Sequence, residues 1–173
     1  MSQNLDRFHR SITYLRVSVT DRCNLRCTYC RTVEAFTPLR HTDILSYEEI
    51  LKVLTAATRL GIKKVRLTGG EPLLRRRFTD FLSMVYNDLE LEDVSITTNG
   101  VFLKKMAGSL YRSGLRRINV SLDTLQRSRY IEITGRDHFS DVWEGLQEAE
   151  AVGFGPIKVN VVVMKGINDD ELI

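Results

Sequence analysis

Two periods of hydrophobicity alternate along this chain. In Thr13–Val19 every second residue is apolar, which is typical of a strand with one buried face. In residues 46–60 the apolar positions recur at helical spacing, which predicts an amphipathic helix. The two patterns then follow one another to the end of the chain, so we expect strands and helices to alternate.

The predicted strands share a short length and many β-branched residues. They cover residues 13–19, 64–68, 94–98, 117–122 and 157–164. The predicted helices cover residues 46–60, 78–89, 103–113 and 139–152, and residues 168–173 look like the first turn of another. Residues 31–45 show no period and are expected to form a loop.

Local signals mark where the helices begin and end. Ser46 and Glu49 have the spacing of a capping box, in which each side chain bonds to the other's backbone. Gly61, Gly114 and Gly153 each follow a helical stripe, where glycine commonly ends a helix. The helix boundaries are therefore predicted by two independent patterns.

Five strands alternating with helices predict an α/β fold with a parallel sheet. Both an open doubly wound sheet and a (β/α) barrel fit this order, and both gather chemistry at the carboxyl ends of the strands. The chain stops soon after the fifth strand, so we expect a fragment of a larger fold. Distinctive residues follow the first four strands: Cys23–Cys30, Gly69–Pro72, Thr98–Gly100, and Ser121 with Asp123.

Composition and charge narrow the class of protein. The chain has 173 residues, 43% of them hydrophobic and 27% charged, which suits one soluble globular domain. Its net charge of +3 comes without a long basic run, so nucleic-acid binding is not expected. No run is apolar enough to cross a membrane, and Met1–Arg10 lacks the apolar core of a secretory signal. We therefore expect a cytoplasmic protein without a membrane partner.

All three cysteines fall within eight residues: Cys23, Cys27 and Cys30. An odd, clustered set argues against a disulfide framework and for a metal site. Three thiolates can hold three irons of a 4Fe–4S cluster and leave the fourth iron open to a small molecule. A structural zinc site with His41 as fourth ligand remains an alternative, as do three unligated cysteines.

The motifs resemble those of a known superfamily. The cysteine loop, with Tyr29 before its last cysteine, and Gly69–Pro72 resemble two motifs of the radical S-adenosylmethionine (SAM) superfamily. Longer stretches resemble GTP 3′,8-cyclase, the radical SAM family that begins molybdenum cofactor biosynthesis. These stretches are residues 13–24, 65–75, 96–100, 119–123 and 162–169.

The resemblance implies a fold, cofactors and ligand contacts. Residues 1–173 would form an incomplete radical SAM core domain, a partial TIM-like (β/α) barrel truncated after about five strands. The implied cluster ligands are Cys23, Cys27 and Cys30. The implied SAM contacts are Tyr29, Gly70 and Ser121, and the implied GTP contacts are Arg16, Arg66, Thr97 and Lys158. The implied reaction converts GTP to 3′,8-cyclo-7,8-dihydro-GTP, with 5′-deoxyadenosine and methionine as by-products.

The chain also departs from the family. Arg31–Thr32 stand where the family has methionine and proline, and family members extend well beyond this chain's length. Their remaining part carries a second 4Fe–4S cluster and a terminal Gly–Gly, so this chain is expected to be an incomplete enzyme. The implied partners are GTP, a flavodoxin or ferredoxin as electron donor, and a second copy in a homodimer. Two alternatives stay open: another radical SAM enzyme, peptide-modifying or cofactor-assembling, and a non-catalytic iron–sulfur or zinc-binding fragment.

Overall fold

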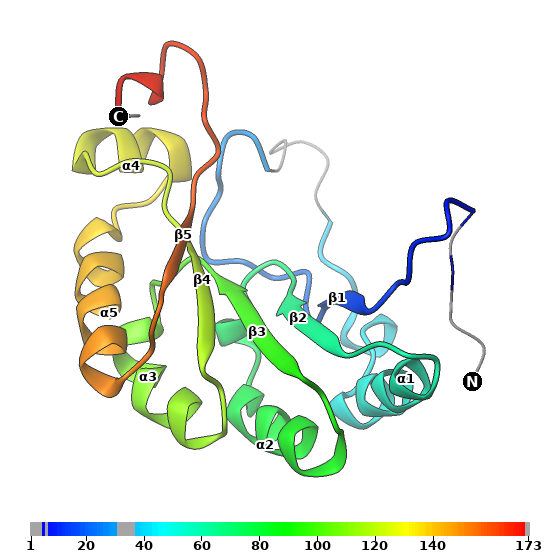
Figure 1. Ribbon diagram of the computed structural model, residues 1–173. Coiled ribbons are helices and arrows are strands. Elements are labelled where there is room, and N and C mark those ends of the chain that lie inside the picture. The colour runs from blue at the N-terminus through cyan, green and yellow to red at the C-terminus, as the bar shows by residue number, and fades with distance from the viewer. Residues whose placement is uncertain (1–4, 6, 31–36, 172–173) are drawn as a thin grey trace.

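A computed structural model describes residues 5, 7–30 and 37–171, so Arg31–Thr32 lie outside the described residues. Figure 1 shows one curved sheet with helices along its outer side. The strands are β1 (Tyr14–Ser18), β2 (Lys64–Thr68), β3 (Asp93–Thr98), β4 (Arg117–Ser121) and β5 (Lys158–Asn160). The helices are α1 (Tyr47–Arg59), α2 (Phe78–Asp88), α3 (Leu103–Arg112), α4 (Arg127–Thr134) and α5 (Phe139–Val152). Short 3-10 turns are η1 (His41–Asp43), η2 (Pro72–Leu74) and η3 (Asp169–Glu171).

The strand order decides between the two predicted architectures. All neighbouring strands are parallel, and their order in the sheet is β1-β2-β3-β4-β5. A doubly wound sheet reverses direction at a switch point, whereas a barrel adds each strand beside the previous one. The sheet therefore has the topology of a partial (β/α) barrel, and the predicted α/β class is confirmed.

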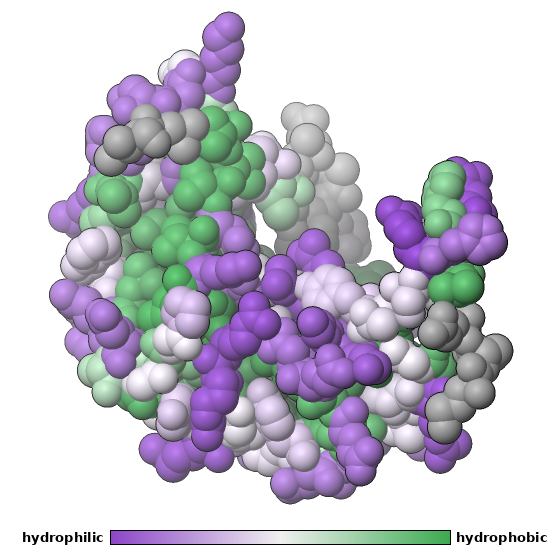
Figure 2. Space-filling view, viewed as in Figure 1, coloured by the Kyte–Doolittle hydropathy of each residue, from purple (hydrophilic) through white to green (hydrophobic). Residues whose placement is uncertain are grey.

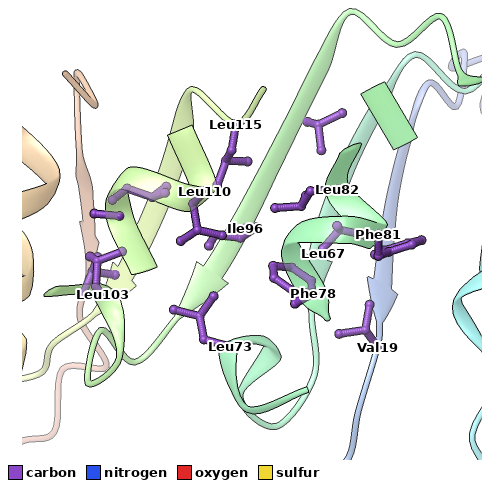
Figure 3. Packing of buried hydrophobic residues seen from close by; sticks show 14 of the residues in the cluster. Val19, Leu67, Leu73, Phe78, Phe81, Leu82, Ile96, Leu103, Leu110 and Leu115 are labelled. Carbon is purple, nitrogen blue, oxygen red and sulfur yellow. The ribbon is translucent and has the colours of Figure 1, made fainter. Parts of the chain in front are cut away.

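The two faces of the sheet differ in polarity. Leu67 on β2, Ile96 on β3 and Val120 on β4 are completely buried on the face that the helices cover. Phe78 and Phe81 of α2 pack into the same core, as Figure 3 shows for Phe78, Phe81, Leu67 and Ile96. Burial of these side chains supplies most of the stabilisation that holds the helices to the sheet.

The opposite face, which we call the polar face, carries hydrophilic side chains on every strand. Parallel sheets usually bury both faces, so a polar one is unusual unless it lines a barrel interior. Figure 2 shows hydrophilic residues gathered over the middle of the sheet and an apolar band along β5. The polar face includes Arg16, Ser18, Arg66, Thr68, Ser95, Thr97, Asn119, Ser121, Lys158 and Asn160.

The predicted capping box at the start of α1 is present. The Glu49 amide donates to the Ser46 hydroxyl at 3.1 Å, and the Ser46 amide donates to the Glu49 carboxylate at 2.7 Å. The predicted glycine endings hold as well, since Gly153 adopts a left-handed conformation directly after α5. Within the described ranges, no helix is both long enough and apolar enough to span a lipid bilayer.

Near the C-terminus the observed elements differ from those that the sequence predicts. The predicted strand over 157–164 is wrong beyond Asn160, because the Val162 amide leaves the ladder and donates to the Asp123 carboxylate at 2.8 Å. Helix α4 was not predicted, since its residues are mostly polar and only a few of them are buried. The predicted first helical turn at 168–173 is a 3-10 turn over Asp169–Glu171, with 172–173 outside the described part.

The central strands should tolerate truncation poorly. Leu67→Ala removes a side chain with no exposed surface and should lower the free energy of unfolding by about 2–5 kcal/mol, because a cavity remains. Leu60→Ala is the matched control, since Leu60 is 61% exposed and the same truncation there should cost no more than about 0.5 kcal/mol. Urea unfolding of both variants measures the difference, and equal losses would contradict this description of the core.

Candidate functional site

The cysteine loop (residues 20–30) lies directly after β1, at the carboxyl edge of the sheet. Two short backbone hydrogen bonds attach it to the glycine loop (residues 69–72) that follows β2. The Gly70 amide donates to the Thr20 carbonyl at 2.7 Å, and the Glu71 amide donates to the Arg22 carbonyl at 2.7 Å. The two motifs that sequence analysis singled out therefore meet in space.

Glycine is required at positions 69 and 70 by this contact. A Cβ atom at Gly70 would overlap the Arg22 carbonyl, and one at Gly69 would overlap the Thr20 carbonyl. Gly69 also has a φ of +150°, which side-chain-bearing residues rarely adopt. The missing side chain of Gly70 thus makes room for the cysteine loop, and its amide is already used there.

Glu71 has a role that its position in the sequence does not indicate. Its side chain is completely buried and accepts hydrogen bonds from the Leu73 amide at 3.0 Å, the Thr98 hydroxyl at 2.8 Å and the Asn99 amide at 2.7 Å. Burial raises the pKa of Glu71 to about 7, and these donors work against that rise. The carboxylate therefore fastens the glycine loop to the end of β3.

The end of β3 also reaches the first cysteine. The Asn99 side-chain nitrogen Nδ2 donates to the Asn24 side-chain oxygen at 2.8 Å and lies 3.8 Å from the Cys23 sulfur. The Asn24 side-chain nitrogen is buried and has no hydrogen-bond partner among the described residues. Such an orphaned donor beside a thiol is consistent with a ligand at this place.

On its other side the cysteine loop is tied to β4 and α4. The Tyr29 hydroxyl donates to the Asp123 carboxylate at 2.6 Å, and burial together with this hydrogen bond raises the pKa of Tyr29. The amides of Arg26 and Thr28 donate to the carbonyls of Thr134 and Ile133, each at 2.9 Å, at the end of α4. The loop is consequently held from both flanks.

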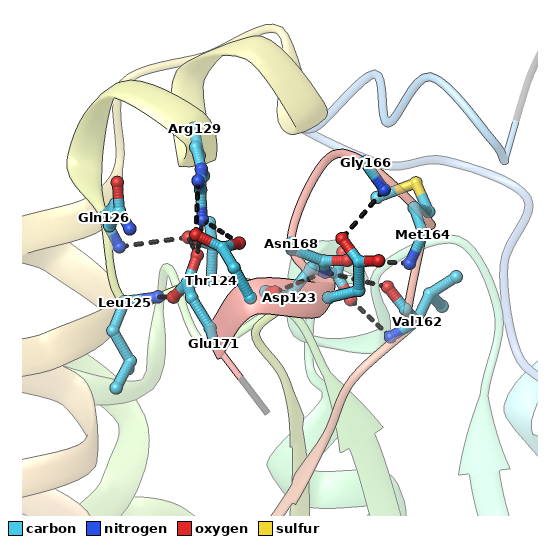
Figure 4. Close-up of polar contacts among 12 residues, drawn as sticks. Asp123, Thr124, Leu125, Gln126, Arg129, Val162, Met164, Gly166, Asn168 and Glu171 are labelled. Carbon is cyan, nitrogen blue, oxygen red and sulfur yellow. Dashed lines mark hydrogen bonds and ion pairs between the residues drawn. The ribbon is translucent and has the colours of Figure 1, made fainter. Parts of the chain in front are cut away.

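Asp123 links the cysteine loop to the segment after β5. Its second carboxylate oxygen accepts from the Val162 amide, and its carbonyl accepts from the Asn168 side chain at 2.7 Å. Figure 4 shows this group beside a second one, in which Glu171 bonds to Thr124 and to Arg129. The segment after β5 is thereby fixed over the carboxyl end of β4.

The three thiols lie close enough to affect one another. Burial, together with the negative charges of Asp123, Cys23 and Cys30, raises the pKa of Cys27 to about 11. Within residues 5, 7–30 and 37–171, no three His, Cys, Asp or Glu side chains converge as a single metal ion requires. Zinc needs ligands at about 2.0–2.3 Å from one centre, whereas a cubane takes its thiolates at separate corners. No fourth donor joins the three thiols among the described residues, so this set suits three corners of a cubane better than a closed zinc site.

Two of the predicted GTP contacts are neighbours on the polar face. Arg16 on β1 is the register partner of Arg66 on β2, and the Arg66 guanidinium donates weakly to the Ser95 hydroxyl at 3.4 Å. In the part of the chain that the structure describes, no carboxylate pairs with Arg16, Arg66 or Lys158. Adjacent like charges across strands are unfavourable by themselves, so this pair is suited to an anionic ligand.

The remaining predicted contacts also lie on the polar face or at its edge. Thr97 and Lys158 both pair with Asn119 in the ladder, so they share one row across the sheet. The Thr97 hydroxyl is buried without a hydrogen-bond partner among the described residues, which leaves it available to a ligand. Ser121 lies one row nearer the cysteine loop, opposite Asn160 on β5. The topology thus places the predicted GTP contacts and Ser121 on one face of the sheet, with the cysteine loop and Gly70 at the carboxyl edge of that sheet.

Glu71 should make the site sensitive to both substitution and pH. In Glu71→Gln the side-chain NH₂ group would replace an oxygen that accepts hydrogen bonds from Leu73, Thr98 or Asn99. At least one of these donors would lose its acceptor, so we expect a loss of about 1–3 kcal/mol in the free energy of unfolding. Because the folded-state pKa lies near 7, above the ordinary 4.5, this carboxyl stabilises the fold fully below pH 4.5 and loses that contribution as pH rises through 7. We expect thermal unfolding between pH 4.5 and 8 to show that the stability of wild type relative to the variant increases as pH falls. Glu90→Gln, at an exposed position, is the matched control and should change the stability by no more than about 0.5 kcal/mol.

The Tyr29–Asp123 hydrogen bond should support the cysteine loop. Tyr29→Phe leaves one Asp123 oxygen without its donor in a nearly buried position, so we expect a loss of about 1–3 kcal/mol in urea unfolding. Tyr14→Phe is the matched control, because Tyr14 is similarly exposed and its hydroxyl donates to no carboxylate among the described residues. A Tyr29→Phe protein as stable as the control would show that the bond is not formed in solution.

Comparison with known proteins places this site in a family. Residues 17–173 match the model of the radical SAM superfamily. The chain is 53% identical over 168 residues to the GTP 3′,8-cyclase of Petrotoga mobilis, covering 97% of this chain and 52% of that protein. It is also 53% identical to the GTP 3′,8-cyclase of Thermodesulfovibrio yellowstonii, again over 52% of that protein. The chain thus spans about half the length of these curated relatives.

Solved structures agree on the fold. Streptococcus suis SuiB, bound to the precursor peptide SuiA, matches with a TM-score of 0.74 at 22% identity, over 88% of this chain and 33% of that one. Methylornithine synthase (PylB) matches with a TM-score of 0.71 at 19% identity, over 91% of this chain and 46% of that one. Both likenesses concern the fold alone. Together, the family match, the cysteine loop at the carboxyl edge of the sheet and the barrel topology show that this chain belongs to the radical SAM superfamily.

Proposed function

We propose that the complete protein containing this chain is a GTP 3′,8-cyclase, acting in the first step of molybdenum cofactor biosynthesis. The observation that carries the proposal is the pair of neighbouring arginines on the polar face, Arg16 and Arg66, which have no carboxylate partner among the described residues. The relatives at 53% identity, which bear the name GTP 3′,8-cyclase, support the same substrate. No comparable observation favours a peptide substrate.

In this proposal the cysteine loop holds the cofactors that the superfamily uses, a 4Fe–4S cluster and SAM. Cys23, Cys27 and Cys30 would bind the cluster as thiolates, which leaves one iron for SAM. The cluster supplies the electron for reductive cleavage of SAM, with methionine and 5′-deoxyadenosine as by-products. The chain's own part is to fix these thiols, and the anchors at Glu71 and Asp123 restrict their movement.

Three residues of this chain are assigned to SAM. Tyr29 would contact it through its backbone, since its hydroxyl is used by Asp123. Gly70 would contact it through its carbonyl, because its amide is bonded to Thr20. Ser121 would contribute its hydroxyl from the end of β4, in the row nearest the cysteine loop. The three come from different segments and approach the same end of the sheet.

GTP would lie on the polar face. Arg16, Arg66 and Lys158 would neutralise the triphosphate, and arginine can hold phosphate oxygens with two parallel hydrogen bonds. Thr97 would offer its otherwise unpartnered hydroxyl. The ribose would then have to face the SAM residues, because transfer of a hydrogen atom requires the two reacting groups to be close together. The product would be 3′,8-cyclo-7,8-dihydro-GTP.

Other parts of the proposal concern the rest of the complete protein. A second 4Fe–4S cluster near the guanine base is expected in the portion of the relatives that this chain does not span. A flavodoxin or ferredoxin would supply electrons, the protein would act in the cytoplasm, and it would form a homodimer.

Anaerobic reconstitution of the complete protein tests the function. With iron and sulfide, we expect a broad absorbance near 400 nm, and a Cys27→Ala variant should lose about 4 iron atoms and roughly half of that absorbance, because the second cluster remains. With dithionite, SAM and GTP, 5′-deoxyadenosine and the cyclised nucleotide should form. Arg66→Ala should raise the Kd for GTP by about 10–100-fold, because a charge-assisted contact is lost, while cluster content stays unchanged.

Three outcomes would contradict the proposal, each in a different way. Stoichiometric zinc without sulfide would indicate a structural metal site. SAM cleavage that neither needs nor converts GTP would indicate another radical SAM substrate. Arg59 ends α1 on the helical side. If an Arg59→Ala control weakens GTP binding as much as Arg66→Ala does, GTP binding does not depend on the polar face.

A further inference from the structure

A second basic region lies on the helical side of the cysteine loop, away from the polar face. It is an open pocket of about 550 Å³, which we call the basic pocket. Its wall comes from the cysteine loop, from the start of α1 and from the turn between η2 and α2. Its charged lining residues are Arg22, Glu48, Arg75, Arg76 and Arg77, with His41 beside them.

The charge of the basic pocket is strongly one-sided. Four arginines face one carboxylate, Glu48, which gives a formal charge of +3 with His41 neutral. Arg77 forms an ion pair with Asp80 at 2.8 Å, outside this lining set. The first turns of α1 and α2 lie at the rim, where helix dipoles add positive potential. The pocket should therefore attract an acidic partner.

The arrangement of the arginines favours a broad partner over a single small anion. The Arg75 guanidinium already donates to the carbonyls of Val19 and Leu45 and stacks on Tyr47 at 4.1 Å. Arg77 is occupied by Asp80, so these two do not converge on a common centre. Arg76 is exposed and has no carboxylate partner in the described ranges. Arginines that are spread around the rim of the pocket are complementary to an extended acidic surface of another protein. Such charge complementarity steers the association of many protein pairs.

The position of the pocket suggests what such a partner would do. Arg22 lines the pocket and directly precedes Cys23, and Thr20 lines it as well. None of the residues assigned to SAM or GTP lines it. A protein docked here would lie close to the cluster ligands and would leave the polar face open to substrate.

We propose that the basic pocket is the docking surface for an acidic one-electron donor protein, which names a partner for the site in the proposed function and rests on it. The donor's redox group would lose one electron and the oxidised cluster bound to the cysteine loop would gain it, with no bond made and no proton moved. Arg76 supplies long-range attraction, and Arg22 brings the surface to the first cluster ligand.

The test uses Arg76→Glu in the complete reconstituted protein, with flavodoxin as the probe. The Kd of oxidised flavodoxin, measured by calorimetry at low salt, should rise by about tenfold and the difference should shrink as salt screens the charges. Formation of 5′-deoxyadenosine driven by flavodoxin and its reductase should fall by a similar factor. The rate driven by dithionite, a small reductant that needs no docking surface, should stay unchanged.

Arg59→Glu is the matched control, because it makes the same charge reversal at the opposite end of α1 and should leave both measurements at wild-type values. Unchanged flavodoxin binding in Arg76→Glu would overturn the proposal. Equal loss with dithionite and flavodoxin would also overturn it, as would weaker GTP binding with flavodoxin binding intact. If wild type cleaves no SAM with dithionite, the proposed function fails, and the binding measurement still decides the docking surface.

Discussion

The close approach of two loops is the constraint on which the rest of the site depends. The backbone after β1 and the backbone after β2 touch through two amide-to-carbonyl bonds, with no space for a side chain between them. Only glycine satisfies that geometry at positions 69 and 70. Once the loops are in contact, Glu71 is forced inward, where it must find donors because a buried carboxylate without them is costly. Thr98 and Asn99 supply these donors from the next strand.

Much of this arrangement followed from simple periodicity. The alternation in Thr13–Val19 and its counterparts predicted the strands, and parallel order then placed the motif residues at one edge. The sequence could not indicate what Glu71 binds, because its partners lie on another strand. It also overestimated β5, since Val161–Val163 look strand-like, yet the hydrogen bond from the Val162 amide to Asp123 ends the ladder. The sequence does not predict helix α4 because few of its side chains reach the core, so it carries no clear hydrophobic stripe.

Two separate sets of arginines emerge from the same sequence. Arg16 and Arg66 face the interior side of the sheet, where period-two alternation places them next to each other. Arg75, Arg76 and Arg77 lie beyond η2 on the helical side, and nothing in their tripeptide distinguished them from a solvated turn. The cysteine loop lies between the two sets. The cysteine loop thus adjoins both the polar face, which we propose for the nucleotide, and the basic pocket, which we propose for a protein partner.

The anchors of the cysteine loop also fix when it can take shape during synthesis. Arg26 and Thr28 bond to carbonyls at the end of α4, and Tyr29 bonds to Asp123, all of which are translated much later than the cysteines. Contacts so distant in sequence form late in folding, after the intervening strands have paired. On the ribosome the three thiols would therefore emerge early and stay unorganised. Insertion of a cluster would have to wait until α4 has been made and has docked.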